Sequence, residues 1–203
     1  MTSGKVLFAA LAALVVSLPQ PAQANQTSTT MIAVVGAAAA TVGVMAIFDD
    51  RENPTTTNPL ASFGVGAFDG INNTDQDWAT DLRVEYRFGN PFFYVVKPLI
   101  ALQATTDGAG GAFAGLVADW VIGEHFVVAP SLAAGLWADG GGKKLGSTIQ
   151  FRSQVEAGYR FDNDWRLTAA ISHISNADLG TSNPGVEIGT VYLNVPADKI
   201  LPR

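Results

Sequence analysis

Three side chains that together can activate an ester for hydrolysis lie close together near the C-terminal end of the chain. In ISHISNADLGTSNPGVEIG, residues 171–189, His173 and Ser175 are two positions apart, and Glu187 follows a loop of polar, Gly and Pro residues. A serine hydroxyl is a poor nucleophile unless an imidazole takes its proton, and a carboxylate must orient that imidazole. These residue types therefore suit attack on an ester carbonyl.

Two β-strands must position these groups. Successive strand side chains point to opposite faces, so His173 and Ser175 share the face of Trp165, Leu167, Ala169 and Ile171. If the next strand pairs with this one across the loop at 176–184, Glu187 comes opposite His173, on a face with Gly189, Val191, Leu193 and Val195. Polar groups that close an apolar face suggest chemistry on a lipid.

The positioning strands belong to a longer series of strand-like runs that begins at residue 60. Eight strands are expected, near residues 60–69, 76–88, 92–104, 110–122, 125–137, 147–161, 165–175 and 185–195. Turn residues separate them. No run after residue 60 is long and apolar enough for a membrane helix. Eight is an even number and the smallest usual for a membrane barrel.

The alternation of polar and apolar residues fits a soluble sandwich as well as a membrane barrel, but the loops favour the barrel. Short connections at 89–91, 123–124 and 162–164 alternate with longer ones at 70–76, 106–111, 138–147 and 176–184, as at the two rims of an outer-membrane barrel. Interface belts are expected to include Phe92, Phe93, Trp120, Phe126, Trp137 and Trp165. The predicted fold is all-β, an eight-stranded antiparallel transmembrane β-barrel.

The lumen of such a barrel is just wide enough to be filled by side chains. We expect one set of charged residues to neutralise one another there: Arg83, Glu85, Arg87, Lys97, Asp119, Arg152, Glu156 and Arg160. A lumen filled in this way is a plug, which disfavours a diffusion channel.

The first part of the chain is expected to serve export. Residues 1–24 have the pattern of a signal peptide, with Lys5, an apolar run and Ala22-Gln23-Ala24 as the cleavage site. Residues 25–59 form an N-terminal apolar segment and linker, in which 31–48 is open to three interpretations: part of a longer export signal, a helix, or a first strand. An export or accessory role is favoured over an inner-membrane anchor. Residues 60–203 are the barrel domain with a short C-terminal tail.

The composition of the chain limits the kinds of partner and metal site that it can have. The formal net charge of -6 argues against a nucleic-acid partner. The chain has no cysteine, so it has neither disulfides nor a thiolate metal site.

The residues of the candidate site also carry a family resemblance. His173-Ile174-Ser175-Asn176-Ala177, followed by Asn183-Pro184-Gly185-Val186-Glu187, resembles the signature of the lipid A 3-O-deacylases, the PagL family. Members of that family are eight-stranded outer-membrane barrels that hydrolyse the ester-linked acyl chain at position 3 of lipid A. The chain departs from a plain barrel in its 31–58 segment and in a tail, 196–203, that lacks the terminal aromatic residue of many such barrels.

The resemblance implies roles for individual residues. The catalytic histidine, serine and glutamate fall on His173, Ser175 and Glu187. Asn176 falls on the asparagine that helps to bind the oxyanion, and Asn183 and Gly185 match supporting loop positions. No metal or cofactor is implied. The implied partner is lipid A, or lipopolysaccharide, in the outer membrane of a Gram-negative cell, and a homodimer is left open.

Other interpretations stay open at this point. The chain can be a structural or adhesive barrel without activity, or a different lipid esterase or acyltransferase with the same three residues. Asn183 and Gly185 are also ordinary turn residues. His125, at the short-turn rim, is expected to be solvated, and Lys143 and Lys144 are either solvated or near the phosphates of lipid A.

Overall fold

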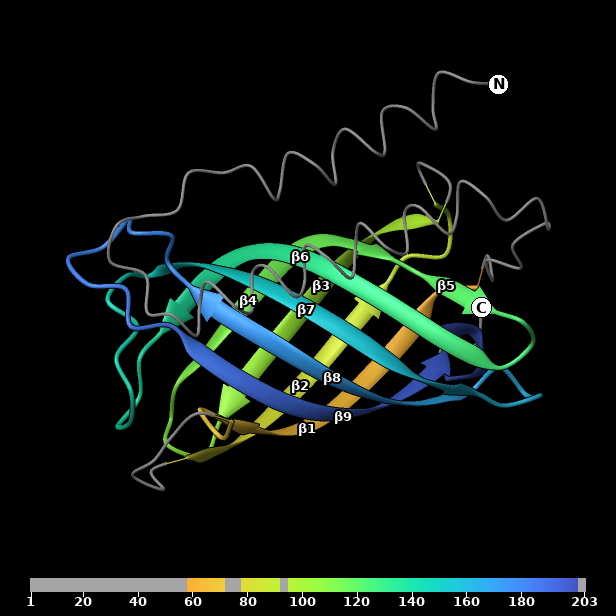
Figure 1. The fold of residues 1–203 in the computed structure, drawn as a ribbon, viewed down its shortest axis with the longest axis horizontal. Helices are drawn as coiled ribbons and strands as arrows, with labels where there is room; N and C mark the ends of the chain where they lie inside the picture. The colour runs from red at the N-terminus through yellow and green to blue at the C-terminus, as the bar shows by residue number, and fades with distance from the viewer. Residues whose placement is uncertain (1–57, 72–77, 92–94, 201–203) are drawn as a thin grey trace, which may run out of the picture. The chain divides into compact units, whose positions relative to one another are not determined.

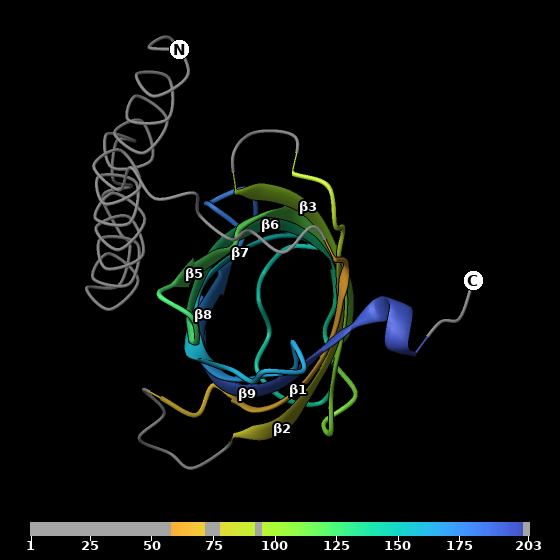
Figure 2. The same cartoon turned by 90° about the vertical axis from the view of Figure 1, so that its right-hand side faces the viewer.

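The computed structural model describes residues 58–71, 78–91 and 95–200, which form a closed antiparallel β-barrel (Figure 1). Viewed from its end, the barrel is a ring of strands around a central lumen (Figure 2). The predicted signal peptide, 1–24, and nearly all of the predicted segment 25–59 lie outside the described residues. Both therefore stay predictions.

The strands lie close to where the sequence places them. They are β1 (Leu60–Phe68), β2 (Ala79–Arg87), β3 (Val96–Thr105), β4 (Gly110–Ala118), β5 (Trp120–Ile122), β6 (Phe126–Ala138), β7 (Ile149–Arg160), β8 (Arg166–Ser175) and β9 (Val186–Pro196). Only Asp119 separates β4 from β5, and both pair with β6 in one continuous register. They act as a single strand, so the predicted eight-stranded barrel is confirmed.

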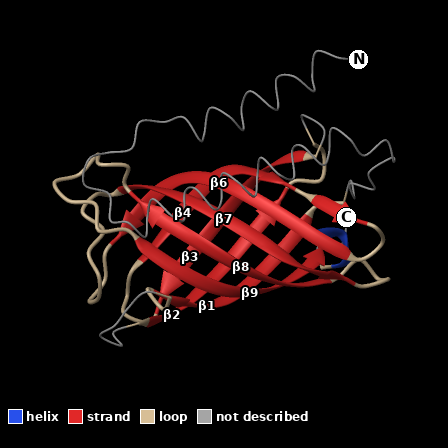
Figure 3. Cartoon of the chain, in the orientation of Figure 1, coloured by secondary structure: helices blue, strands red, loops and turns tan. Residues whose placement is uncertain are grey.

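Closure of the sheet leaves the long strands without a free edge. Except for β4 and β5, which follow each other along one line, strands that are neighbours in the chain pair with each other; β1 also pairs with β9, and β4 pairs with β6. The loops gather at the two ends of the barrel (Figure 3). One rim carries the connections β1–β2, β3–β4, β6–β7 and β8–β9, and the other carries β2–β3, β5–β6 and β7–β8. The rim that carries the β8–β9 connection is called the site rim, because β8 ends and β9 begins there.

The outward face of the barrel is apolar. The exposed large hydrophobic side chains include Phe63, Val65, Leu82, Val84, Ile100, Leu102, Leu116, Leu132, Leu136, Leu167, Ile171, Val191 and Leu193. A soluble protein rarely exposes a continuous apolar wall of this size, whereas a membrane barrel turns such a wall toward lipid. Separately, no helix in the described part of the chain is long and apolar enough to cross a bilayer.

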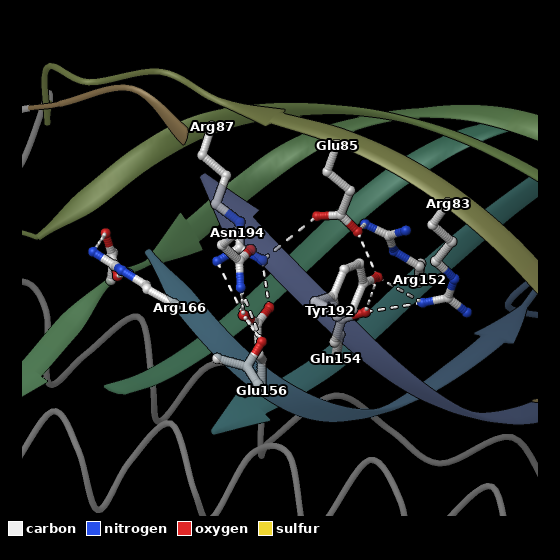
Figure 4. A network of polar contacts seen from close by, with 11 residues as sticks. Arg83, Glu85, Arg87, Arg152, Gln154, Glu156, Arg166, Tyr192 and Asn194 are labelled. Atoms are coloured by element: carbon white, nitrogen blue, oxygen red, sulfur yellow. Dashed lines mark hydrogen bonds and ion pairs between the residues drawn. The ribbon is translucent and has the colours of Figure 1, made fainter. Parts of the chain in front are cut away.

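The lumen is filled by a charged network (Figure 4). Arg87 pairs with Glu156, which also accepts hydrogen bonds from Thr168 and Asn194. Asp119 holds both Lys97, at 2.9 Å, and Arg166, at 2.6 Å. These side chains are almost wholly buried. Each charge is paired, which offsets the cost of removing it from water.

Around the middle of the lumen, the network is organised by Glu85 and Arg83. Glu85 pairs with Arg152 at 2.9 Å and accepts a hydrogen bond from the Tyr192 hydroxyl. Arg83 donates to Asp81 at 2.6 Å and to Ser172 at 3.0 Å. The predicted plug of mutually neutralising charges is therefore present. Asp81, Arg166 and Tyr192 belong to it as well, whereas Arg160 lies at its edge, partly exposed and bound to Asp164.

An apolar cluster lies in the lumen toward the site rim. Trp137 stacks on Phe68, with ring centroids 5.5 Å apart, and contacts Phe113. Leu145, from the β6–β7 loop, is buried in the same cluster, as are Ile174 of β8 and Ile188 of β9. The strands that carry the predicted site therefore rest on packed side chains.

Two details of the sequence-based prediction are wrong. Trp120 and Trp137 were expected in the interface belts, but both are buried, and Trp137 packs inside the lumen. The β3–β4 connection, expected to be long at 106–111, spans only 106–109, because Gly110 and Gly111 pair with β3. Phe126 and Trp165 are exposed near strand ends as predicted, and Phe92 and Phe93 lie outside the described residues.

Candidate active site

His173 and Glu187 form a direct pair between neighbouring strands. They are register partners in β8 and β9, and Nδ1 of His173 lies 3.2 Å from Oε1 of Glu187. A carboxylate at this distance accepts a hydrogen bond from Nδ1–H. It therefore fixes the tautomer in which the lone pair of Nε2 is free to take a proton.

Ser175 follows His173 on the same outward face at the end of β8. Residues two apart on a strand are roughly 6–7 Å apart at the backbone, a distance that serine and histidine side chains can bridge. Ser175 is partly exposed and pairs in register with Phe151 of β7. All three predicted catalytic residues therefore lie together at the site rim.

The His173–Glu187 pair is well shielded from solvent. His173 is 2% exposed and Glu187 6%. Nε2 of His173 is buried and has no hydrogen-bond partner among the described residues. Buried polar atoms are usually paired, and an unpaired one calls for an explanation, such as a bound water or a role in chemistry. An unpaired Nε2 in the tautomer set by Glu187 is what a general base requires.

Asn176 points the other way, into the barrel. Its side-chain Nδ2 donates to the carbonyl oxygens of Leu145, at 2.8 Å, and Ser182, at 2.7 Å. Its backbone N–H donates to Oδ1 of Asn183 at 3.0 Å. All of these donors are thus engaged in holding loops together, while the predicted catalytic side chains of β8, His173 and Ser175, lie on the opposite face of the strand.

The loop between β8 and β9 is built from unusual backbone conformations. Ala177 and Asp178 both have positive φ, 51° and 61°, and Leu179 N–H donates to the Asn176 carbonyl at 3.0 Å. Two consecutive positive φ values within such a bond form a tight turn that non-glycine residues adopt at some cost. Gly185 has a φ of 62°, which suits glycine, and β9 begins directly after it.

The β6–β7 loop, 139–148, links the other loops of the site rim. Lys143 pairs with Asp69, beyond β1, at 2.8 Å. Gly141 N–H donates to the Asp107 carbonyl, beyond β3, at 2.7 Å. The Leu145 carbonyl accepts the hydrogen bond from Asn176, and its side chain is buried in the lumen cluster. The sequence predicts a long connection here but not its contacts with the other loops, since its partners are distant along the chain.

The remaining candidates from the sequence lie outside the site. His125 is at the opposite rim, where its Nδ1 is 2.9 Å from the Arg160 carbonyl and its ring stacks on Tyr159. Lys143 is held by Asp69, and Lys144 donates to the Gly140 carbonyl. In the described part of the chain, no three His, Asp or Glu side chains are grouped as metal ligands would be.

Comparison with known proteins supports the family resemblance. The family model for lipid A 3-O-deacylase (PagL) matches residues 102–196, which contain the whole candidate site. A crystal structure described as that of the outer membrane enzyme PagL has a similar fold, with a TM-score of 0.54 and 17% identity, over 68% of this chain and 99% of that one. The resemblance drawn from the motif is thereby confirmed, and with it the barrel fold.

Two other barrels are similar at lower scores. A de novo designed transmembrane β-barrel has a TM-score of 0.49 and 11% identity, over 68% of this chain and 96% of that one. The Yersinia pestis outer membrane protein Ail has a TM-score of 0.41 and 14% identity, over 67% of this chain and 99% of that one. No curated protein matches the sequence of this chain. The family match and the barrel fold together indicate a place in the outer membrane.

Proposed function

We propose that this chain, which matches the lipid A 3-O-deacylase family over residues 102–196, is an outer-membrane serine esterase that removes the 3-O-acyl chain of lipid A. The observation that carries the proposal is the contact between His173 and Glu187 at 3.2 Å, with Ser175 beside it on the outward wall. Ser175 is the partly exposed member of the three, so an ester of a membrane lipid would meet its hydroxyl from the side of the bilayer.

The reaction follows from the roles of the three side chains. Oγ of Ser175 attacks the ester carbonyl carbon while Nε2 of His173 takes its proton. Collapse of the tetrahedral intermediate expels the sugar oxygen, which receives that proton, and leaves the acyl group on Ser175. Water then attacks the acyl carbon with His173 as base, and the fatty acid leaves as Ser175 regains its proton. Glu187 stabilises the imidazolium in both halves.

The oxyanion that forms on the carbonyl needs hydrogen-bond donors. Asn176 was the first candidate in the sequence, but its donors are bound to Leu145, Ser182 and Asn183. Asn183 uses its oxygen to accept from Asn176, so its amide nitrogen is the side-chain donor of the motif that remains for the oxyanion. In this proposal Asn176 and Gly185 shape the loop, and Asn183 stabilises the oxyanion.

Export by a signal peptide at 1–24 is part of the same proposal, because an outer-membrane enzyme must leave the cytoplasm. A homodimer stays a prediction. No metal or cofactor takes part in the proposed steps, since the serine supplies the nucleophile and the histidine moves the proton.

A serine-directed fluorophosphonate probe tests the activated nucleophile. We expect the wild-type protein, folded in detergent, to be labelled at Ser175. His173→Ala should lose labelling while keeping the fold, because the hydroxyl loses its base. Equal labelling of the wild type and His173→Ala, or labelling at another residue, would contradict the proposed roles. Lipid A, compared with other acyl esters, then separates the deacylase from a different esterase.

A further inference from the structure

The outward wall of the barrel carries very few polar side chains, and most of them are in one place. Along the described strands, the outward positions hold mainly Ala, Val, Leu, Ile, Gly and aromatic residues. Apart from tyrosines, the polar ones are Thr80, Ser153, His173, Ser175 and Glu187. Thr80 lies near the start of β2, whereas the other four lie on the adjacent strands β7, β8 and β9. Of these four, Ser153 is the one that the proposed reaction does not use.

The register of the strands places Ser153 directly beside the catalytic base. His173 pairs with Glu187 of β9 on one side and with Ser153 of β7 on the other. Side chains directly opposite each other on neighbouring strands have Cβ atoms about 4.5–5.5 Å apart. By register, Ser153 is therefore the direct neighbour of His173 on the β7 side, as Glu187 is on the β9 side.

The neighbours of Ser153 explain why a hydroxyl is unusual there. The outward residues that flank it along β7 are Phe151 and Val155, and the next row of the wall is Val155, Ile171 and Gly189. A hydroxyl facing lipid loses hydrogen bonds with water and gains nothing in packing. The row Ser153–His173–Glu187 is thus a short polar strip set in an apolar surface.

The two sides of the imidazole have different partners. Nδ1 is bound by Glu187, while Nε2 is buried with no partner among the described residues. Ser153 lies across His173 from Glu187. A small molecule bound at Nε2, beside Ser175, would therefore find a further polar group in Ser153, while the next outward residues are apolar: Phe151, Val155 and Ile171.

We propose that Ser153 binds the water that completes the reaction, an inference that rests on the proposed function. The water donates one hydrogen to Nε2 of His173 and the other to Oγ of Ser153, and its lone pair points at the acyl carbon on Ser175. As the new C–O bond forms, Nε2 takes the proton. That proton passes to Oγ of Ser175 when the C–O bond to Ser175 breaks. Ser153 is unchanged at the end.

The position of Ser153 on a lipid-facing wall explains why the hydrolytic water needs a second polar partner. Water is scarce at a wall that faces lipid, and an ordered water needs two or more polar partners to be held. The acylation half of the reaction brings its own reactant, the lipid ester, and does not need this water. Loss of the Ser153 hydroxyl should therefore slow the second half of the reaction selectively.

Threonine and valine provide a matched pair for the test, because they have the same shape and differ in the hydroxyl. The full-length protein, folded in detergent, is given a short-chain nitrophenyl ester, whose phenolate release reports acylation as an initial burst and deacylation as the steady rate. We expect Ser153→Val to keep the burst rate and to lose about tenfold to a hundredfold in the steady rate. The intact mass should show the acyl group accumulating on the protein, and Ser153→Thr should stay within a few-fold of the wild type.

Added hydroxylamine sharpens the result. This nucleophile cleaves the acyl-enzyme without a positioned water, so it should restore turnover in Ser153→Val much more than in the wild type.

Equal steady rates for Ser153→Val and Ser153→Thr, or equal losses in burst and steady rates, would overturn the proposal. Activity in Ser175→Ala together with its loss in Ser153→Ala would make Ser153 the nucleophile. A wild type that cleaves neither this ester nor lipid A would overturn the proposed function itself, and the role of Ser153 with it.

Discussion

His173 and Glu187 face each other across β8 and β9, and Nδ1 of the histidine lies 3.2 Å from Oε1 of the glutamate. This pair joins the two strands at the rim where Ser175 ends β8. The loop between the two strands therefore has to return the chain in one register only. A shift of one residue in β9 would turn Glu187 into the lumen.

The first prediction concerns the nucleophile and the base. Ser175→Ala and His173→Ala should each abolish ester hydrolysis, because one removes the attacking atom and the other its proton acceptor. Both side chains lie at the end of β8, outside the lumen network, so the barrel should still fold. Turnover of lipid A in detergent measures the first effect, and heat-modifiable gel mobility measures the second. A lost mobility shift would mean that the residues are structural.

Glu187 should be less critical than either. Glu187→Ala removes the group that orients His173 but leaves the nucleophile and the base in place, so some activity should remain. Glu187→Gln tests the charge separately, because the amide keeps the size of the side chain and a hydrogen-bond acceptor. We expect Glu187→Gln to retain more activity than Glu187→Ala. Complete inactivity of both variants, with the fold intact, would show that Glu187 does more than orient the imidazole.

Asn176 and Asn183 should fail in different ways. Asn183→Asp keeps the oxygen that accepts from the Asn176 N–H and loses the amide donor, so hydrolysis should fall by roughly 10²–10³, as when one oxyanion donor is removed, with the loops unchanged. Asn176→Asp instead places a carboxylate against the carbonyls of Leu145 and Ser182, which should loosen both loops. Limited proteolysis at 139–148 and 176–185 distinguishes the two. Equal protease resistance with equal loss of activity would contradict these separate roles.

The charged network in the lumen should contribute to the free energy of unfolding of the barrel. Glu156→Ala leaves Arg87, Thr168 and Asn194 without their shared acceptor. Breaking one side of a buried ion pair costs about 3–5 kcal/mol, because the other charge stays buried. Unfolding by urea, followed through the mobility shift, should show this loss. Glu156→Ala combined with Arg87→Met is the control, and it should recover part of the stability because no charge is then left unpaired.

Much of this fold follows from the alternation of residues along the chain. The eight strands, the apolar outer wall and most of the charged lumen were predicted in this way, because a period of two assigns each side chain to a face. The burial of Trp137 follows from the same period, because in β6 it has the opposite parity to exposed Phe126, so alternation itself places it inside. Its nearness to a strand end was the weaker signal.

The site was harder to predict, since it depends on registers. The short turn at 161–165 fixes how β7 pairs with β8, so the neighbourhood of Ser153 and His173 can be counted from that turn. The loop at 176–185 is too long to fix β8 against β9 in the same way, and the pairing of His173 with Glu187 was an assumption until the structure supplied it. The contacts of Asn176 with Leu145 span 31 positions and leave no local trace in the sequence.

Mass spectrometry of lipid A tests the central claim most directly. Lipid A is extracted from a host that expresses the wild-type chain or Ser175→Ala, with both proteins shown to be folded in the outer membrane. The account predicts that the wild type alone removes one hydroxyacyl group, and that fragmentation places the loss at position 3. Unchanged lipid A with the folded wild type, or the same loss with Ser175→Ala, would contradict it.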